Sequence, residues 1–593
     1  MRFVLGGAIR TEGGTRRRTA FLGLVSLVIA ACEDAAGPKS TVSLGQEPEA
    51  GLGTLAVPCT AGCVLPPTVF ARRDGQTAPD LREFAGDPGA RYVLIVQDDG
   101  REGTAAEIKL NGRTVVKRTA LQGFAISELA VGVQLKASNR LTVLPLGTIG
   151  ASVTVWIAGR ALVDPATVVA SAAGLMKTWV NTRNAGTPSL TLTAMADHTT
   201  MSWNNWNARY YSSYGVDCPN RCGWVNSTAT HLGDQVQPYW YGMYSMLASA
   251  NDILFAIRKS ASPPDLGSDK ERIEAIAQMA QAMAHGWISL NYDQGFILLE
   301  ETDPLTLTLS TRAQMRDKAM ELFDKAYTLA DGATFNTGAT WFGTVNSPIY
   351  SSKQLTKVIR TMQAELLASY PRNSEENAQV NWGAVAAFAA AGISSGTNAP
   401  PFDFEMYADG NRDFFSQYHA WTNDYTTTRG DTRVARLIAT NQIDPWPGGA
   451  GNPQPNAGIY GVDRRLGDGC FGDTDDWMGM GGCAATANSG TDFAWSPVAI
   501  FQPGRGSFHQ SNIGSIRDHC LAGIYPDCPT GTGPLPVLSK AYNDLLWAEG
   551  LIRGNGSRTT AAALINGSRV GRGGLPPVSG TDSDQDLLRA AAF

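Results

Sequence analysis

The sequence predicts a mainly α-helical protein, in which a helical domain with long loops follows a small all-β sandwich domain. Three observations lead to this prediction. Apolar and polar residues alternate between about Val69 and Ala158, which is the period of half-buried strands. After Asp164 the apolar residues recur at helical spacing over several long segments. From about Pro400 to Pro534, Gly, Pro, Asn and Asp cluster and the periodicity is lost.

The chain has 593 residues, which is too long for one core, so we expect more than one domain. Charged residues make up 17% of the chain and the net charge is -6, so no basic field exists to attract nucleic acid. The 14 Trp and 64 Gly give an aromatic-rich composition that is typical of exported binding proteins. We expect a signal peptide over 1–31, a tether over 32–66, the β-sandwich over 67–160 and the helical domain over 161–593.

The N-terminus is typical of a bacterial lipoprotein signal. Arg16–Arg18 form a positive segment, and Ala20–Ala31 is an apolar stretch too short for a permanent membrane span. Small residues stand directly before Cys32, as in the lipobox, where cleavage leaves a lipidated cysteine. We therefore expect lipidation of Cys32 and attachment to the membrane through the lipid anchor only. The alternative is ordinary cleavage nearby, with Cys32 incidental.

The other eight cysteines fall in four close pairs. An oxidising compartment converts such pairs into local disulfides. Zinc is the alternative, but the sequence contains no CxxC spacing, and His519 is the only histidine beside a cysteine. We expect no metal or other cofactor and four disulfides: Cys59 with Cys63, Cys218 with Cys222, Cys470 with Cys483, and Cys520 with Cys528.

The β-rich segment carries clear strand and turn signals. Tyr92–Val96 reads as a strand. The dipeptide Asn111-Gly112 joins Glu107–Leu110 to Arg113–Val116, which predicts a hairpin with a type I′ turn. Short strands at this spacing favour a small β-sandwich. Since the segment shows no catalytic constellation, we expect a spacer or an accessory binding module.

The segments after Asp164 predict one-sided helices that must pack on one another. Pro165 suits the first turn of a helix. Thr311 with Gln314, and Ser351 with Gln354, have the spacing of a capping box. The predicted helices are Gln237–Arg258, Glu271–Leu290, Thr311–Leu329, Ser351–Leu366, Asn381–Ile393, Leu538–Ile552 and Thr559–Val570.

In their order, these segments resemble the SusD/RagB family of outer-membrane lipoproteins. The sequence QPYWYGMYSMLASANDIL from Gln237 to Leu254 looks like the family's second long helix. The sequence IAQMAQAMAHGWISL from Ile276 to Leu290 resembles another of its helices, although Ala-Met stands where the family usually has Leu-Arg. Gly430–Arg433 is similar to the family's Asp-Pro-Arg turn.

The most specific block lies near the C-terminus. The tripeptide AEG at Ala548–Gly550, followed by LINGSRVGRGGL at Leu564–Leu575, resembles the family's closing signature "AEA … iN-x-x-R-x-R-x-G-L". We call Leu564–Leu575 the closing signature. The resemblance covers roughly Asp164 to Leu575, so the β-rich segment lies outside it.

The resemblance implies a helical fold with tetratricopeptide-like helix pairs that support an irregular loop face. It implies a SusC-like, TonB-dependent outer-membrane transporter as the partner, over which the protein sits as a lid, and it implies no catalysis. The acidic residues after Cys32 also resemble the surface-export signal of lipoproteins in bacteria that carry such proteins. We therefore expect a protein that is lipid-anchored at the extracellular face of the outer membrane.

Aromatic rings stack on sugar rings, and amides and carboxylates bond their hydroxyls. Such residues gather between the first and second helices, where the family often places ligand contacts, and again in the mid-chain loops, where Trp495 is a further candidate. The alternative is that Trp203 and Trp206 form one packed helix face and that the mid-chain aromatics are core. The residues expected to bind ligand are Trp203, Asn204, Trp206, Arg209, Tyr210, Tyr211, Trp446, Tyr460 and Trp477.

Enzyme motifs and metal motifs are weak. Calcium would suit the acidic run Asp468, Asp473, Asp475 and Asp476, but the EF-hand spacing is missing and a solvated loop is favoured. The sequence has no HExxH, GxSxG, phosphate-binding or dinucleotide motif. We expect a binding protein, not an enzyme, that takes an oligosaccharide, a peptide or another nutrient to the transporter. The alternatives are a secreted glycan-degrading enzyme with a helical catalytic domain and distant paired carboxylates, and a structural or adhesive surface protein.

Overall fold

The structure of the chain is a computed structural model. No helix in the part of the chain that it describes is long and apolar enough to cross a membrane. The described residues are 63–88, 91–98, 104–118, 128–159, 164–184, 186–196, 198–201, 233–260, 263–302, 307–410, 413–422, 428–438, 462–470, 492–495, 511, 513–523 and 530–592.

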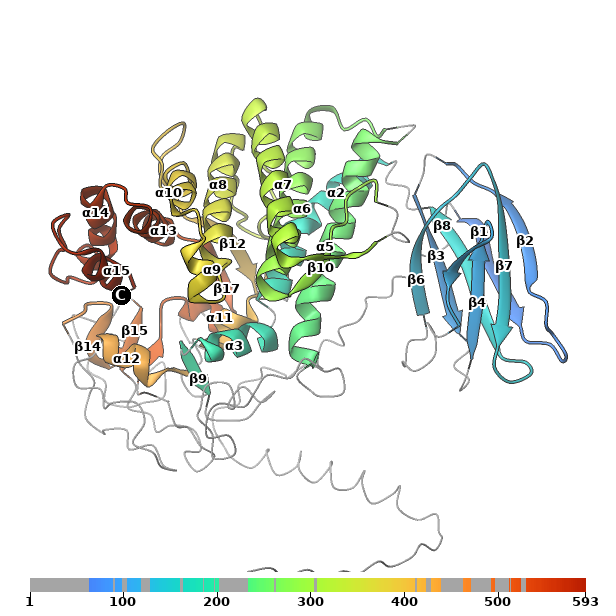
Figure 1. Ribbon diagram of the computed structural model, residues 1–593, viewed down its shortest axis with the longest axis horizontal. Coiled ribbons are helices and arrows are strands. Elements are labelled where there is room, and N and C mark those ends of the chain that lie inside the picture. Colours follow the sequence, from blue (N-terminus) through green and yellow to red (C-terminus); the bar gives the residue numbers. More distant parts are fainter. Residues whose placement is uncertain are drawn as a thin grey trace, which may run out of the picture. The chain divides into compact units, whose positions relative to one another are not determined.

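Two four-stranded antiparallel sheets make up the N-terminal described part (Figure 1). The first has the order β1-β8-β3-β6 and the second β2-β7-β4-β5. Leu94 and Val155 of the first sheet share a buried core with Ile108 and Leu141 of the second, so the sheets pack face to face as a sandwich. The strands are β1 (Cys63–Ala71), β2 (Asp80–Ala85), β3 (Arg91–Asp98), β4 (Ala105–Leu110), β5 (Arg113–Val116), β6 (Glu128–Gln134), β7 (Ser138–Leu146) and β8 (Ser152–Gly159).

The hairpin between β4 and β5 is confirmed. Asn111 and Gly112 have φ of 52° and 84°, and a type I′ turn needs positive φ at both central residues. The Asn111 side chain also joins the turn to β7. It donates to Asn139 Oδ1 over 2.9 Å and accepts from the Arg140 backbone N–H over 2.9 Å.

A row of helices begins at Pro165, and each helix packs against the next one along the row. The Asp164 carboxylate caps the first helix by accepting from Thr167 N over 2.9 Å, and Pro165 fills the first turn as expected. Figure 1 shows α5 to α8 side by side. The helices of the row are α2 (Pro165–Arg183), α5 (Gly233–Arg258), α6 (Lys270–Asn291), α7 (Arg312–Gly332), α8 (Ser352–Ser369), α10 (Trp382–Ala390), α13 (Lys540–Arg553), α14 (Arg558–Arg569) and α15 (Asp584–Ala592).

The predicted capping boxes are both present, at Thr311 with Gln314 before α7 and at Ser351 with Gln354 before α8. One predicted start is wrong. Leu538 does not open a helix, because it is the last residue of strand β17 (Thr532–Leu538), and α13 begins after its N-cap Ser539. Among the described residues, five short α-helices were not expected: α3 (Gly186–Met195), α9 (Ser374–Ala378), α11 (Gln417–Thr422), α12 (Thr432–Ile438) and α15.

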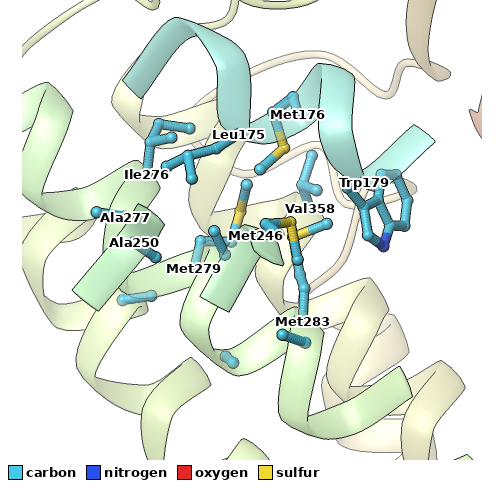
Figure 2. Packing of buried hydrophobic residues seen from close by; sticks show 14 of the residues in the cluster. Leu175, Met176, Trp179, Met246, Ala250, Ile276, Ala277, Met279, Met283 and Val358 are labelled. Carbon is cyan, nitrogen blue, oxygen red and sulfur yellow. The ribbon is translucent and has the colours of Figure 1, made fainter. Parts of the chain in front are cut away.

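The core of the row is rich in methionine and alanine. In Figure 2, Met176, Met246, Met279 and Met283 meet between neighbouring helices. Helix α6 is buried along most of its length, and its small alanines let α5 and α7 approach it closely. Flexible methionines fill the irregular spaces that remain.

An extended segment after α6 is fastened to α5 and α6 by buried polar side chains. It begins with β10 (Gln294–Phe296), which pairs with β11 (Leu309–Thr311). The Tyr244 hydroxyl accepts from Phe296 N over 2.5 Å, and Asn251 donates to Leu298 O over 3.0 Å. His285 Nδ1 donates to Gln281 O over 2.7 Å, so its Nε2 is free to accept from Leu298 N over 3.2 Å.

Candidate functional site

The loop-rich region leaves and rejoins the helical scaffold at one two-stranded ribbon. Strand β12 (Phe404–Asp409) pairs antiparallel with β17, so that Asp409 lies opposite Thr532. The ribbon is anchored in the helical core, where Phe404 and Leu535 are fully buried. The Tyr350 hydroxyl adds two bonds of 2.8 Å to the backbone of β12. Residues 410–531 therefore form one connection between the two paired strands of this ribbon.

Four short strands within residues 410–531, together with one strand from earlier in the chain, form what we call the strand platform. Strand β9 (Thr199–Met201) pairs with β13 (Thr428–Gly430), and β14 (Leu466–Cys470), β15 (Phe493–Trp495) and β16 (Ile513–Ser515) form a second sheet. Ser511 joins the two sheets, since its backbone N–H and its hydroxyl both donate to Gly430 O, over 3.1 and 2.7 Å. β9 itself comes from far earlier in the chain, between α3 and α5.

The strand platform lies at the ends of the segments that carry the predicted ligand residues. Residues 202–232 follow β9, residues 439–461 lie between α12 (Thr432–Ile438) and the start of β14, and residues 471–491 lie between β14 and β15. Ile438 and Leu466, which flank the second segment, share a buried cluster, and Phe493, which follows the third segment, packs against it. Ends of the last two segments therefore meet. Outside the described residues lie Trp203, Asn204, Trp206, Arg209, Tyr210, Tyr211, Trp446, Tyr460 and Trp477, whose ligand-binding role stays a prediction.

The turn that resembles the family's Asp-Pro-Arg turn connects β13 to α12. Asp431 is fully buried, and its backbone N–H donates to His198 O over 3.1 Å, which ties it to the start of β9. Its carbonyl accepts from Ala435 N over 2.9 Å as the first helical bond of α12. The turn therefore fixes the direction in which α12 leaves the strand platform.

The closing signature contacts the strand platform. Arg572 donates to the Asp492 carboxylate, just before β15. The backbone N–H of Arg464 donates to Gly573 O over 2.8 Å, just before β14. Burial raises the pKa of Asp492, and the charge of Arg572 opposes that rise most strongly. The C-terminal segment thus contacts the residues directly before β15, through an ion pair, and those before β14, through a backbone hydrogen bond.

The asparagine and the first arginine of the closing signature stabilise their own turn. Asn566 donates to Val578 O over 2.8 Å and accepts from Val578 N over 2.9 Å, as a strand partner would. Arg569 donates to Pro576 O over 2.7 Å. These bonds explain the residue types at both positions as structural requirements, because each satisfies backbone groups of the turn.

His419 lies in α11 (Gln417–Thr422), a helix that contacts β13 of the strand platform, and its imidazole is neutral and mostly buried. Its Nδ1 is 2.5 Å from the Ser416 hydroxyl, and its Nε2 is 3.6 Å from Asp518 Oδ2. Burial, together with the charges of Arg183 and Arg517, lowers the pKa of His419 to about 3. Burial outweighs the nearby carboxylate, so His419 is a weak base suited to holding structure.

Among the described residues, at least two cavities lie between the helices. The lining of the smaller of these two, which has a volume of about 300 Å³, includes Arg258, Gln278, Gln281 and Glu300. These side chains bond one another: Arg258 donates to Glu300 over 2.8 Å and to Gln278 over 3.0 Å, and Gln281 donates to Glu300 over 3.0 Å. Their polar groups are thus engaged in holding the segment after α6. The larger cavity, of about 440 Å³, is formed by α9, α10, α13 and α15, two of which the sequence did not predict.

The cysteine and metal predictions are tested only in part. Cys63 and Cys520 are disulfide-bonded. The cysteines predicted to pair with them, and one or both members of the other two pairs, lie outside the described residues, so the four pairings stay predictions. Within the described part of the chain, no group of three His, Cys, Asp or Glu could hold a metal ion. Cys32 and Asp473, Asp475 and Asp476 lie outside that part.

Comparison with known proteins gives structural likenesses alone. No family model matches the chain, and no curated protein matches it. A SusD-like carbohydrate binding protein from Bacteroides fragilis has a TM-score of 0.46 at 12% identity, over 72% of this chain and 82% of that one. A SusD homolog from Bacteroides thetaiotaomicron has a TM-score of 0.44 at 14% identity, over 72% and 83%.

A further SusD/RagB family protein from Bacteroides thetaiotaomicron has a TM-score of 0.38 at 11% identity, over 71% of this chain and 78% of that one. The solved structures that the chain resembles therefore include several SusD-like proteins, as the sequence resemblance led us to expect. Likeness at this level leaves the function to be argued from the chain's own residues.

Proposed function

We propose that the chain is a SusD/RagB-like lipoprotein of the outer-membrane surface, which binds an oligosaccharide or another nutrient and delivers it to a TonB-dependent transporter. The observation that carries the proposal is the strand platform. Segments from distant parts of the sequence, each with predicted ligand residues, start or end at five short strands. A rigid base that displays several variable segments is how binding proteins commonly build a site.

The helical row is the scaffold of this proposal. Its sequential packing, in which each helix contacts the next, is compatible with tetratricopeptide-like pairs. The ribbon and the closing signature join the strand platform to that scaffold at separate places. A ligand held by the loops would therefore be presented in a fixed orientation, as delivery to a transporter requires.

The proposal includes no catalysis. Two histidines, the buried His285 of α6 and the mostly buried His419 of α11, have pKa values lowered to about 4 and about 3. Such weak bases are poor proton acceptors at neutral pH. Both make hydrogen bonds that hold the chain, which accounts for their burial without a reaction.

Calorimetry with a panel of neutral and acidic oligosaccharides tests the binding. We expect saturable binding without product, and a loss of roughly tenfold or more in affinity for the double variant Trp203→Ala, Trp206→Ala, since each stacked ring contributes about 1 kcal/mol or more. Trp240→Phe, in α5, is the control outside the loops. Release of shorter sugars from the panel would reject the binding role and favour the glycan-degrading alternative.

Location and partner need separate experiments in the native host. We expect Cys32→Ser to abolish incorporation of labelled palmitate and to release the protein from the membrane fraction. Protease added to whole cells should degrade the wild-type protein if it faces outward. Co-purification of an outer-membrane barrel with the tagged protein would support delivery to a transporter, and its absence under mild detergent would count against it.

A further inference from the structure

The cavity of about 440 Å³ lies apart from the strand platform, whose described strands do not line it. Its volume falls within the range of small-molecule sites. Polar groups predominate in its exposed lining, and Trp382 of α10, Ile552 of α13 and Leu588 of α15 supply the smaller apolar part. These apolar side chains can contact the C–H groups of a ligand.

The rim of the cavity carries polar side chains that are available for hydrogen bonds to a ligand. The Ser374 hydroxyl and the Asn377 carboxamide come from α9, and the Asn555 carboxamide comes from the turn after α13. Within the described part of the chain these three side chains form no hydrogen bond. Two carboxamides and a hydroxyl offer both donors and acceptors, which is what the hydroxyl groups of a ligand require.

The charged groups of the rim are already neutralised. Arg553 lies over the Trp382 ring at 5.0 Å, and its Nε donates to Glu549 over 2.6 Å. Asp584 is paired with Arg558 Nε, also at 2.6 Å. The cavity therefore has no net charge to attract an anion or a cation, while the terminal nitrogens of Arg553 can still donate to a neutral oxygen.

We propose that this cavity is a second binding site for a neutral, polyhydroxylated ligand, namely a short neutral saccharide. The inference deepens the proposed function, since it takes its ligand class from it. The site is separate from the loops, so one long saccharide or two short ones could be held at two places. Two linked contacts on one chain raise the apparent affinity without strengthening either contact.

Hydrogen exchange of the full-length protein locates binding directly. The probes are the tetrasaccharides of the malto, cello, xylo and manno series, each at saturating concentration. We expect at least one to slow exchange in Ser374–Ala378 and Arg553–Asn555. Ala378→Trp, which fills the cavity from an exposed position of α9, should abolish that protection, whereas Ala387→Trp, exposed on α10 and outside the lining, should leave it.

Asn377→Ala should weaken binding at this site by roughly fivefold to tenfold, as expected for one lost hydrogen bond. The inference is overturned if no probe protects these segments, or if Ala378→Trp leaves the protection unchanged. The double variant Trp203→Ala, Trp206→Ala separates the two sites. If the cavity segments are still protected in this variant, the second site is supported even when the loops bind nothing. If the variant loses all saccharide binding and the cavity segments are never protected, only the second site is overturned.

Discussion

Arg572, near the C-terminus, forms an ion pair with Asp492, at the start of β15. The pair joins two segments that are far apart in the sequence. Asp492 is 13% exposed and Arg572 is 33% exposed, so the carboxylate depends on the guanidinium more than the reverse. The closing signature therefore contributes to the stability of the strand platform as well as to its own turn.

Arg572→Gln is predicted to lower the free energy of unfolding by about 1–2 kcal/mol. Removing the guanidinium leaves a mostly buried carboxylate unpaired, but the partial exposure of Arg572 reduces the cost below that of a fully buried pair. Urea unfolding measures the change. Arg589→Gln is the matched control, since Arg589 and Asp586 are 65% and 59% exposed and 3.7 Å apart, and we expect almost no effect there. Equal effects of the two variants would contradict the prediction.

Gly550→Ala is predicted to destabilise the protein by about 1–3 kcal/mol, although alanine is the better helix former. A Cβ at this position of α13 would lie 2.6 Å from Ala386 N and 2.9 Å from Ala386 Cα in α10. These are backbone atoms, so the two helices would have to separate. Gly567→Ala, in α14, has no atom within 4 Å of the new Cβ and should stabilise by up to about 1 kcal/mol. Melting temperatures that shift in the same direction would contradict this account.

Because His285 is buried, the free energy of unfolding should decrease at acid pH. Burial lowers its pKa from 6.5 to about 4, so the unfolded chain binds the proton more tightly than the folded one. The stabilisation is complete above pH 6.5 and is lost as the pH falls toward 4, by about 3 kcal/mol in all. The difference in unfolding free energy between the wild type and His285→Gln, followed from pH 7 to pH 4, isolates this contribution. A difference that does not change with pH would reject the neutral imidazole.

The two capping boxes should each contribute to stability. Thr311→Ala removes the acceptor for Gln314 N at the start of α7, and Ser351→Ala does the same at α8. Each change is predicted to cost about 1 kcal/mol, measured by urea unfolding. Thr311→Ser keeps the hydroxyl and should retain most of the stability. Loss of the same size in Thr311→Ser would indicate that the methyl group, and not the cap, is responsible.

Features that depend on neighbouring residues were predictable from the sequence. The Asn111-Gly112 turn, Asp164 before Pro165 and both capping boxes are local patterns, and the structure confirms all of them. Long helices of the row were also predictable, because an apolar stripe repeats over several turns.

Features that depend on distant residues were not predictable in this way. The strand platform combines β9 with strands more than two hundred residues later, in stretches of three to five residues that carry no clear period. The larger cavity likewise needs α9 beside α13 and α15. Leu538 was assigned to a helix because its apolar neighbours suit either a strand end or a helix start.

The pairing of Asp409 with Thr532 has a consequence for how the chain can change. Because the two ends of residues 410–531 already meet in a ribbon, lengthening or shortening the stretch between them alters the entropy of closing a loop only slightly. The helical scaffold can thus tolerate insertions and exchanges there while its own packing stays the same. New binding properties could arise in that stretch by recombination, while the rest of the chain keeps the same fold.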